Sequence, residues 1–465
     1  MNNTPKVVFM PHANLQYSQL RPEKREWVIH NCYEKLFDLI RQRGWHMAFE
    51  ASGKTLDWIY EQAPEVMGKL RKLVQEGQIE PVASPYIHFM MANVPRELCL
   101  RSLKRGIQAW VRCTGKAPRI GWNPECGWTS YILDVYKEAG LEAIILDADS
   151  FFLSFDEIRQ ATGLHYDVQG HSNKTKLARI ESYIEDKPEF LKYLTKASQA
   201  PNGLKVIMRT DCIANLLLWY LMGATEGARS QPVSGEEIET AFSLWKNRIA
   251  ATGNFVMAYA EDAEYIGSSA YFYVKQFNEA RFFEPEPDSI RRFEEIVEKA
   301  EQVGLRLALP SDVLQETVDE DINRFVECVE NGVAWHGGTA KAWANTEQSL
   351  VLDPVCRSIL EGIQTVEKHI GNNQEAQASL ERAFDALESA WVSDARWPPE
   401  PTSPGRFNVR EAIQDLYTAN AAIEEAMQQA GIAAQRSLYS PSLMHTQIRA
   451  TEKKLMEMKY FEEGC

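Results

Sequence analysis

The sequence predicts an α/β protein whose fold class is an incomplete or distorted (β/α)7-type barrel followed by a C-terminal α-helical bundle domain. Two observations predict this fold. Over about the first 310 residues, short β-branched and apolar runs alternate with longer amphipathic segments, which is typical of parallel strands joined by crossover helices. Beyond residue 312 the strand signal stops, and segments with helical spacing of apolar residues follow one another.

The predicted strands are short apolar runs, namely Val7–Met10, Met47–Glu50, Glu80–Ala83, Ile120–Trp122, Ala143–Leu146, Lys205–Met208, Phe255–Tyr259 and Leu305–Leu309. The predicted helices between them are Arg25–Arg43, Pro64–Glu76, Arg96–Thr114, Ile132–Ala139 and Asp288–Val303. The carboxyl ends of parallel barrel strands meet on one face, where active sites are built. We expect the polar residues nearest the strand ends to gather there: His12, Glu50, Glu80, Glu125, Asp147, Arg209, Asp211 and Asp262.

The C-terminal third is predicted to be helical, with helices at Ile322–Gly332, Asn345–Ile370, Ala376–Val392, Val409–Ala430 and Thr446–Phe461. The proline-rich segment Pro398–Gly405 is unsuitable for a helix interior and is expected to be a loop. We therefore expect two domains, a barrel domain over residues 1–312 and a helical domain over residues 313–465.

Composition excludes several classes of protein. The 50 Lys and Arg residues against 65 Asp and Glu give a net charge of -15, which would repel a nucleic-acid backbone. No run of 18 apolar residues is present, so no membrane partner is expected. The eight cysteines form no CxxC pair and no disulfide framework, which favours reduced thiols and a cytoplasmic location. No cofactor and no catalytic metal are expected, and the oligomeric state is left open.

Glu125 is the first candidate for chemistry. It follows a predicted strand, stands behind Pro124, and is flanked by Trp122 and Trp128, whose rings could wall a sugar site. Cleavage of a glycosidic bond with retention requires two carboxyl groups about 5 to 5.5 Å apart, one ionised and one protonated. A capping or surface role for a glutamate in a Pro-Glu turn is the alternative.

A second group of carboxylates follows the strand Phe255–Tyr259, where Glu261, Asp262 and Glu264 lie within four residues. Crowding of like charges raises the pKa of at least one of them, which is how an acid stays protonated near neutral pH. Which of the three is raised is not decided by the residues alone. A solvated acidic turn is the alternative.

Four segments together resemble glycoside hydrolase family 57, the family of α-amylases, 4-α-glucanotransferases and glucan branching enzymes. They are Met10-Pro-His-Ala-Asn14, Gly77-Gln-Ile-Glu80, Trp122-Asn-Pro-Glu-Cys-Gly127 and Asp262-Ala-Glu-Tyr-Ile-Gly267. The resemblance implies that Glu125 is the nucleophile and Asp262 the acid/base, with Glu261 remaining an alternative for the acid. It also implies substrate-binding roles for His12, Glu80, Trp122 and Glu264.

The resemblance extends into the helical part of the chain. Trp335-His336-Gly337-Gly338 resembles a Trp-His-Gly segment of some members, and Trp391–Trp397 loosely matches the family's fifth motif. Trp335, His336 and Asp394 are therefore expected to bind substrate, so the helical domain is expected to contribute to the active-site cleft. Ala13-Asn14 departs from the Gln-Pro or His-Leu that often follows the family's first His.

The function that the resemblance implies is a retaining glycoside hydrolase or transglycosidase acting on α-1,4-linked glucose through a covalent glycosyl-enzyme. Whether water or another glucan is the acceptor is left open. The alternatives are a non-catalytic α-glucan-binding or regulatory protein, an α-galactosidase-type member of the family, and a metal-dependent polysaccharide deacetylase. The last lacks the metal-ligand spacing that it needs.

Overall fold

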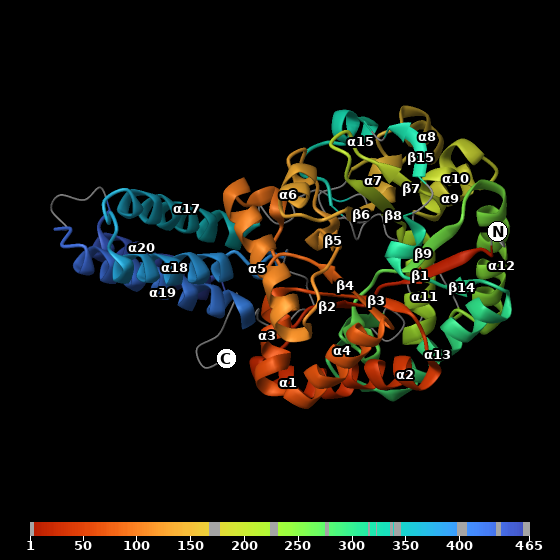
Figure 1. The fold of residues 1–465 in the computed structure, drawn as a ribbon, viewed down its shortest axis with the longest axis horizontal. Coiled ribbons are helices and arrows are strands. Elements are labelled where there is room, and N and C mark those ends of the chain that lie inside the picture. Colours follow the sequence, from red (N-terminus) through yellow and green to blue (C-terminus); the bar gives the residue numbers. More distant parts are fainter. Residues whose placement is uncertain are drawn as a thin grey trace. The chain divides into compact units, whose positions relative to one another are not determined.

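A computed structural model describes residues 4–166, 177–223, 231–274, 279–314, 317–321, 323–334, 338, 346–397, 407–433 and 439–458. The chain divides into two compact units, and Figure 1 shows their elements. The barrel unit contains Met1–Leu15, Glu23–Tyr86 and Pro95–Ala340, and the helical unit contains Gln16–Pro22, Ile87–Val94 and Lys341–Cys465.

The barrel unit is built on two sheets. One has the order β15-β7-β8-β6-β5-β4-β3-β2 and the other the order β14-β1-β9. The strands of these two sheets are β1 (Lys6–Phe9), β2 (His12–Ala13), β3 (Met47–Ala51), β4 (Ile79–Ala83), β5 (Ile120–Trp122), β6 (Ala143–Asp147), β7 (Ala197–Gln199), β8 (Lys205–Arg209), β9 (Phe255–Tyr259), β14 (Arg306–Leu307) and β15 (Thr317–Asp321). Two short antiparallel pairs are formed by β10 (Gly267–Ser268) with β13 (Pro285–Glu286) and by β11 (Tyr271–Val274) with β12 (Glu279–Phe282).

The two sheets together form the predicted (β/α)7-type barrel, because β1 and β2 are two parts of one interrupted strand. β1 pairs with β9 and β14, whereas β2 pairs with β3, and all these pairs are parallel. Within the described residues no ladder joins β8 to β9, so the barrel is incomplete. The fold class predicted from the sequence is confirmed.

The barrel interior is filled by apolar side chains that alternate along the strands, so it is a packed core and not a channel. Val8, Ala48, Val82, Ile145 and Ile207 are buried there, at most 1% exposed. The polar groups of interest therefore lie above this core, at the strand ends.

Helices follow most strands, as predicted. They include α1 (Arg25–Val28), a π-helical segment (Ile29–Glu34), α2 (Lys35–Arg43), α3 (Gly53–Gln62), α4 (Pro64–Glu76), α5 (Arg96–Thr114), α6 (Ile132–Glu138), α7 (Ala148–Phe152), α8 (Asp156–Thr162), α9 (Ala178–Ile184), α10 (Pro188–Thr195), α11 (Asp211–Met222), α12 (Gly235–Thr252), α13 (Pro287–Gln302), α14 (Pro310–Val313) and α15 (Asn323–Cys328). Their ends follow local chemistry: α4 begins at Pro64, and the residue after its last one, Gly77, is left-handed with φ 77° and caps the helix.

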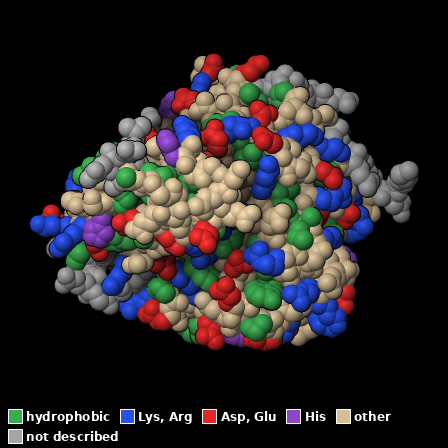
Figure 2. Space-filling view, turned by 60° about the vertical axis from the view of Figure 1, so that its left-hand side comes forward, with side chains coloured by type: hydrophobic (Ala, Val, Ile, Leu, Met, Phe, Trp, Pro, Cys, Tyr) green, Lys and Arg blue, Asp and Glu red, His purple; other side chains and the backbone are tan. Residues whose placement is uncertain are grey.

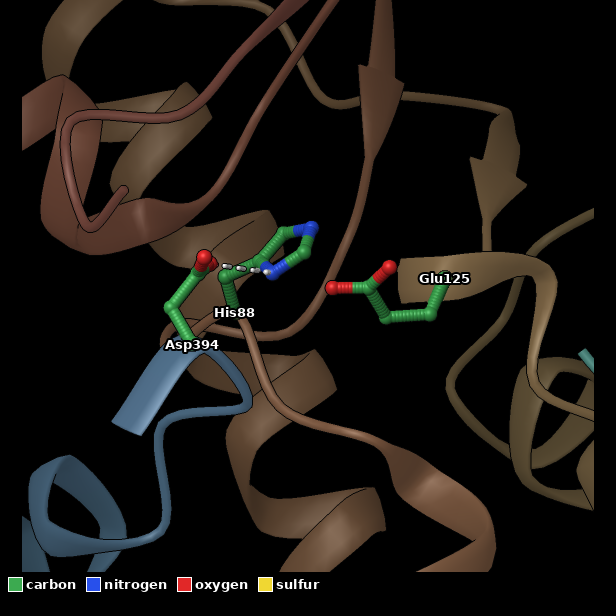
Figure 3. A group of neighbouring side chains, drawn as sticks. All are labelled: His88, Glu125 and Asp394. Carbon is green, nitrogen blue, oxygen red and sulfur yellow. Dashed lines mark ion pairs between the residues drawn. The ribbon is translucent and has the colours of Figure 1, made fainter. Parts of the chain in front are cut away.

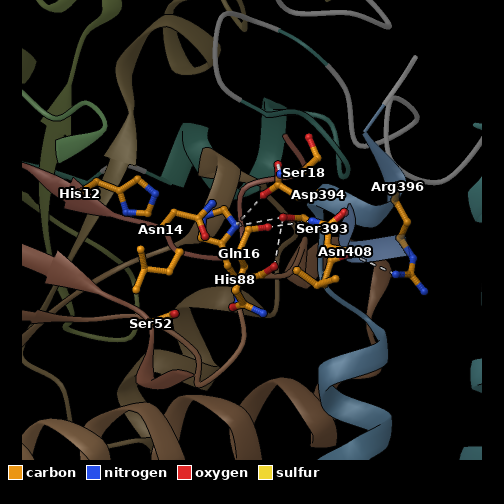
Figure 4. A network of polar contacts seen from close by, with 12 residues as sticks. His12, Asn14, Gln16, Ser18, Ser52, His88, Ser393, Asp394, Arg396 and Asn408 are labelled. Carbon is orange, nitrogen blue, oxygen red and sulfur yellow. Dashed lines mark hydrogen bonds and ion pairs between the residues drawn. The ribbon is translucent and has the colours of Figure 1, made fainter. Parts of the chain in front are cut away.

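The helical unit is a bundle of α17 (Glu347–Glu367), α18 (Gln374–Ala390), α19 (Phe407–Gln429) and α20 (Pro441–Glu457). Two short segments from the N-terminal part of the chain belong to this unit. The Gln16 side chain accepts a hydrogen bond from the backbone N–H of His88 (2.9 Å), and the Asn408 amide donates to the Gln16 carbonyl (2.7 Å). Figure 4 shows this network.

Two expectations need correction. The strand signal was predicted to stop at residue 312, yet β15 follows and pairs in parallel with β7, with Thr317 opposite Ala197. The compact units also differ from the predicted division at 312/313, because residues 16–22 and 87–94 join the helical unit and the chain passes between units at 340/341. The predicted loop Pro398–Gly405 lies outside the described residues.

The surface agrees with the mixed composition. On the face shown in Figure 2, acidic and basic side chains are intermixed. Among the described residues, no helix combines the length and the apolar character needed to cross a membrane.

Candidate active site

Glu125 lies in a tight turn directly after β5. Pro124 opens a single turn of 3-10 helix, Pro124–Cys126, and its fixed φ favours that start. The turn is closed by backbone hydrogen bonds from Cys126 to Asn123 (2.9 Å) and from Gly127 to Pro124 (3.1 Å). The Asn123 amide also donates to the Gly127 carbonyl. These contacts fix the backbone on which the Glu125 carboxylate is carried.

The backbone of this turn is strained. Glu125 has φ 58° and ψ 14°, and Cys126 has φ 47°, so two consecutive residues with a Cβ are left-handed, which L-residues rarely adopt. Strain of this kind costs of the order of 1–3 kcal/mol per residue and gathers at functional sites. The conformation of the turn thus supports a functional reading of Glu125.

The strain at position 125 predicts that a glycine variant is more stable than an alanine variant, the reverse of the usual order. Glycine in place of alanine normally destabilises, but at a left-handed position it removes the steric penalty. We expect Glu125→Gly to be more stable than Glu125→Ala by about 1 kcal/mol. Urea unfolding of the two variants measures the difference. A more stable alanine variant would show that the turn is not strained.

Asp262 is placed beside His12 by the pairing of the first strand with β9. The backbone N–H of Met10 donates to Tyr259 (2.7 Å) and that of His12 donates to Glu261 (2.9 Å). His12 and Asp262 form an isolated parallel bridge, and His12 Nε2 lies 3.8 Å from Asp262 Oδ1. The Asp262 side chain is 24% exposed, so solvent reaches it.

The neighbouring carboxylates are bound by the protein. Glu261 Oε1 accepts from Arg209 Nη2 at 3.0 Å. Glu264 is fully buried and accepts from the Asn14 backbone N–H (2.8 Å) and from the Tyr33 hydroxyl. Burial and then the charge of Asp262 raise the pKa of Glu264 to about 8. Of the three carboxylates, Asp262 is the one with the most exposed side chain.

Arg209 holds a buried acidic cluster at the ends of β6 and β8. It contacts Asp147 (3.4 Å) and Asp211 (2.5 Å) as well as Glu261. Burial and the charge of Asp211 raise the pKa of Asp147 to about 7, and burial with the Asp147 charge raises the pKa of Asp149 well above its usual range. These groups therefore favour a partly protonated state around one guanidinium.

The carboxylates of Asp147, Asp149 and Asp211 lie within 4.8 Å of one another, a spacing that a metal ion can use. Protein donors already approach their oxygens. Asp147 Oδ2 accepts from the N–H and hydroxyl of Ser150 (2.8 and 2.6 Å), and Asp149 Oδ2 accepts from the N–H of Asp211 (2.7 Å). These contacts, together with Arg209, give the carboxylates a structural role. The absence of a catalytic metal stays a prediction.

His12 is clamped between three groups of the barrel unit. Its Nδ1 contacts the Glu50 carboxylate, its Nε2 faces Asp262, and its ring centroid is 4.6 Å from that of Trp122. Burial lowers the pKa of His12, but the charges of Glu50, Asp262 and Glu264 outweigh this effect and raise it to about 10. Sequence reasoning noted Glu50 at a strand end but did not assign it to the site.

The other predicted site residues divide into three groups. Trp122 ends β5 and lies against His12, and its substrate-binding role stays a prediction. The expectation that Glu80 lies with the polar groups at the carboxyl ends of the strands is wrong, whereas its substrate-binding role stays a prediction. Glu80 is the second residue of β4, at the opposite end of the barrel, and accepts from the Ser311 N–H (2.9 Å). Trp335 and His336 lie outside the described residues.

Asp394 belongs to the helical unit. Its Oδ1 accepts from the Ser18 N–H (3.2 Å), and its Oδ2 lies 4.0 Å from His88 Nδ1. Figure 3 shows the His88 and Asp394 side chains with this contact, and it also draws Glu125. His88 Nδ1 lies 2.9 Å from the Ser393 hydroxyl. His88 stands outside the recognised motifs, and no pattern in the sequence singles it out.

The chain resembles known carbohydrate-active enzymes at two levels. Residues 4–217, a little under half of the chain, match glycosyl hydrolase family 57. An α-amylase of Pyrococcus furiosus is 29% identical over 133 residues, 28% of this chain and 20% of that relative. A 4-α-glucanotransferase of Thermococcus kodakarensis is 28% identical over 140 residues, 28% of this chain and 21% of the relative. The matches thus span about a fifth of the length of these curated relatives.

Solved structures share the fold over most of the chain. A GH57-type branching enzyme from Pyrococcus horikoshii has a TM-score of 0.62 at 13% identity and covers 93% of this chain and 95% of its own. The α-amylase AmyC from Thermotoga maritima has a TM-score of 0.60 at 10% identity, with 95% and 99% coverage. At this low identity the solved structures show a shared fold. The match of residues 4–217 to glycosyl hydrolase family 57 confirms the resemblance, and this region contains three of the four motifs.

Proposed function

We propose that this chain is a retaining glycoside hydrolase or transglycosidase that acts on α-1,4-linked glucans by double displacement. The observation that carries the proposal is the strained turn that holds Glu125 within the Trp-Asn-Pro-Glu-Cys motif. A second carboxylate, Asp262, lies in the same unit, beside His12. The α-amylase and 4-α-glucanotransferase relatives support the choice of an α-glucan as substrate.

In the proposed first step, the Glu125 carboxylate attacks the anomeric carbon while the glycosidic C–O bond breaks. Asp262 gives its proton to the departing oxygen, so the leaving sugar departs as an alcohol. In the second step, Asp262 removes a proton from the acceptor hydroxyl, which attacks the anomeric carbon and releases Glu125. Water as acceptor gives hydrolysis, and a glucan hydroxyl gives transfer.

Asp262 is preferred to Glu261 as the acid/base on the contacts of the two side chains. The guanidinium of Arg209 donates to Glu261 at 3.0 Å and also contacts Asp147 and Asp211, so the Glu261 carboxylate is part of a buried cluster. Asp262 instead combines the larger exposed fraction with a position facing His12. Substrate-binding roles for Trp335, His336 and Asp394 stay predictions.

The test of the proposed function is product analysis with the purified full-length chain and linear maltooligosaccharides. Proton NMR should show that the first product has the α configuration at the anomeric carbon, as retention requires. Chain shortening with new reducing ends identifies hydrolysis, redistribution of chain lengths identifies 4-α-glucan transfer, and new branch points with a changed iodine spectrum identify branching. Binding without conversion, a β-configured first product, or cleavage of α-galactosides alone would overturn the proposal.

A further inference from the structure

Glu50 lies beside His12, on the neighbouring strand, because of the strand register. In the parallel pair of β2 and β3, His12 is opposite Glu50, so the two side chains can project to the same side of the sheet. Glu50 is fully buried and His12 is 6% exposed. The contact between the Glu50 carboxylate and His12 Nδ1 is thus shielded from solvent, and electrostatic interactions are strong in such a buried environment.

The contact determines which way the imidazole faces. A carboxylate accepts hydrogen bonds, so Nδ1 must carry the proton that it donates to Glu50. The ring is also held against Trp122, with centroids 4.6 Å apart. With Nδ1 and the ring face both engaged, Nε2 is left facing Asp262 at 3.8 Å.

The charges around His12 also favour a protonated imidazole next to Glu50. The second oxygen of Glu50, Oε1, is buried and accepts no hydrogen bond from the described residues, and a buried carboxylate is costly unless it is paired with a positive group. His12 is its partner. The charged groups that act on His12 are Glu50 from β3 and Asp262 and Glu264 from the loop after β9. All three are acidic, and each favours the imidazolium when it is ionised; Glu264, whose pKa is raised to about 8, does so mainly at higher pH.

We propose that Glu50 is a positioning residue that orients and charges His12, and that His12 in turn stabilises the carboxylate which Asp262 becomes when it donates its proton. This inference rests on the proposed acid/base role of Asp262. Glu50 itself need not touch substrate. As the proton leaves Asp262, negative charge develops beside a positive charge that is already in place, which is electrostatic stabilisation of the transition state.

The variant Glu50→Gln keeps the size of the side chain and removes its charge. In this variant the pKa of His12 should fall. Burial lowers that pKa, and the carboxylate of Glu50, which raised it most strongly, is gone. Imidazole ¹⁵N NMR should show a charged His12 in the wild-type protein at neutral pH and a titration shifted to lower pH in the variant.

Kinetics separate this role from a merely structural one. Aryl maltosides with poor leaving groups need the acid, whereas those with good leaving groups do not. For Glu50→Gln we expect kcat/KM to fall roughly 10-fold or more with poor leaving groups and to change little with good ones. A uniform loss across the series, or no loss at all, would overturn the proposal.

The matched control is Glu34→Gln. Glu34 Oε2 lies 2.7 Å from His30 Nδ1, so this substitution also removes a carboxylate from a histidine, but at the surface. It should leave both the leaving-group dependence and the His12 signal unchanged. In the double variant His12→Gln/Glu50→Gln, Glu50→Gln should add almost nothing to the effect of His12→Gln, because Glu50 acts through His12. Additive effects would contradict the proposal.

Two further arms keep the test decisive. If Glu50→Gln does not fold, Glu50→Asp retains the charge at a shorter reach, and His12 should stay charged while kcat/KM falls for poor leaving groups. The NMR readout does not depend on turnover. An unshifted His12 titration in Glu50→Gln therefore refutes the inference alone, whereas wild-type activity in an Asp262 variant refutes the proposed function.

Discussion

Replacing Glu125 with Gln is expected to reduce turnover of α-1,4-glucans by about 10⁴-fold or more while the fold stays intact. The amide has nearly the shape of the carboxylate but cannot attack the anomeric carbon, so no glycosyl-enzyme forms. The turn itself should be retained, because it is closed by backbone bonds and by Asn123. Reducing-sugar release or chain-length redistribution measures the loss, and circular dichroism checks the fold.

The matched control for this substitution is Glu138→Gln. Glu138 is a glutamate at the end of the following helix, α6, where it forms a surface ion pair with Arg96 at 2.8 Å. Surface pairs contribute about 0–1 kcal/mol to stability, so this variant should keep wild-type activity. Turnover within a few-fold of wild type in Glu125→Gln would show that another group is the nucleophile.

A trapping experiment locates the covalent bond directly. An activated glycosyl fluoride that forms the intermediate quickly and releases it slowly should add one sugar mass to the wild-type protein. Peptide mass spectrometry should place that mass on the peptide containing Glu125, and Glu125→Gln should remain unlabelled. Labelling of another carboxylate would reassign the nucleophile.

Much of the barrel could be predicted because its signals are local. The strand Ile120–Trp122 and the helices Pro64–Glu76 and Arg96–Thr114 begin and end where the sequence predicts. These segments have clear apolar spacing and clear breakers such as Pro64 and Gly77. β15 was missed because its pairing with β7 joins residues far apart in the chain, and no local pattern encodes such a partner.

In the candidate site, too, residues in local motifs could be predicted, whereas roles that depend on strand pairing could not. Glu125 and Asp262 stand in motifs that can be read along the chain. The role of Glu50 follows from its register opposite His12, and that register is a property of the sheet. Glu80 was misplaced for a different reason. The predicted strand Glu80–Ala83 already starts at this residue, as the observed strand Ile79–Ala83 nearly does, and only the resemblance of Gly-Gln-Ile-Glu to a family motif favoured a place at the active-site end.

The choice among the three carboxylates after β9 also depended on non-local contacts. Arg209, which binds Glu261, comes from the end of β8, and Tyr33, which binds Glu264, comes from the π-helical segment. Without these partners, only the resemblance to the family separates Asp262 from Glu261 and Glu264. The structure leaves Asp262 as the carboxylate that faces both His12 and solvent.

Replacing Asp262 with Ala is expected to reduce activity about 10²- to 10⁴-fold on natural glucans, because their leaving groups are alcohols that need a proton. Aryl maltosides with good leaving groups should form the glycosyl-enzyme at near-normal rates. The variant should then accumulate this intermediate, because no base is left to activate water. Burst kinetics followed by slow turnover is the expected signature.

Added azide distinguishes the two carboxylates by the stereochemistry of its product. In Asp262→Ala, azide needs no base and attacks the glycosyl-enzyme from the face that the leaving group vacated, which gives an α-glycosyl azide. In Glu125→Ala, azide takes the place of the missing nucleophile and attacks the substrate directly, which gives the β-glycosyl azide.

The same experiment tests Glu261 as the alternative acid/base. If azide rescued Glu261→Ala with an α product but did not rescue Asp262→Ala, the acid/base would be Glu261. Since Arg209 binds Glu261 at 3.0 Å, we expect Glu261→Ala to lose activity through the Arg209 cluster alone and to show neither azide rescue nor a new dependence on the leaving group.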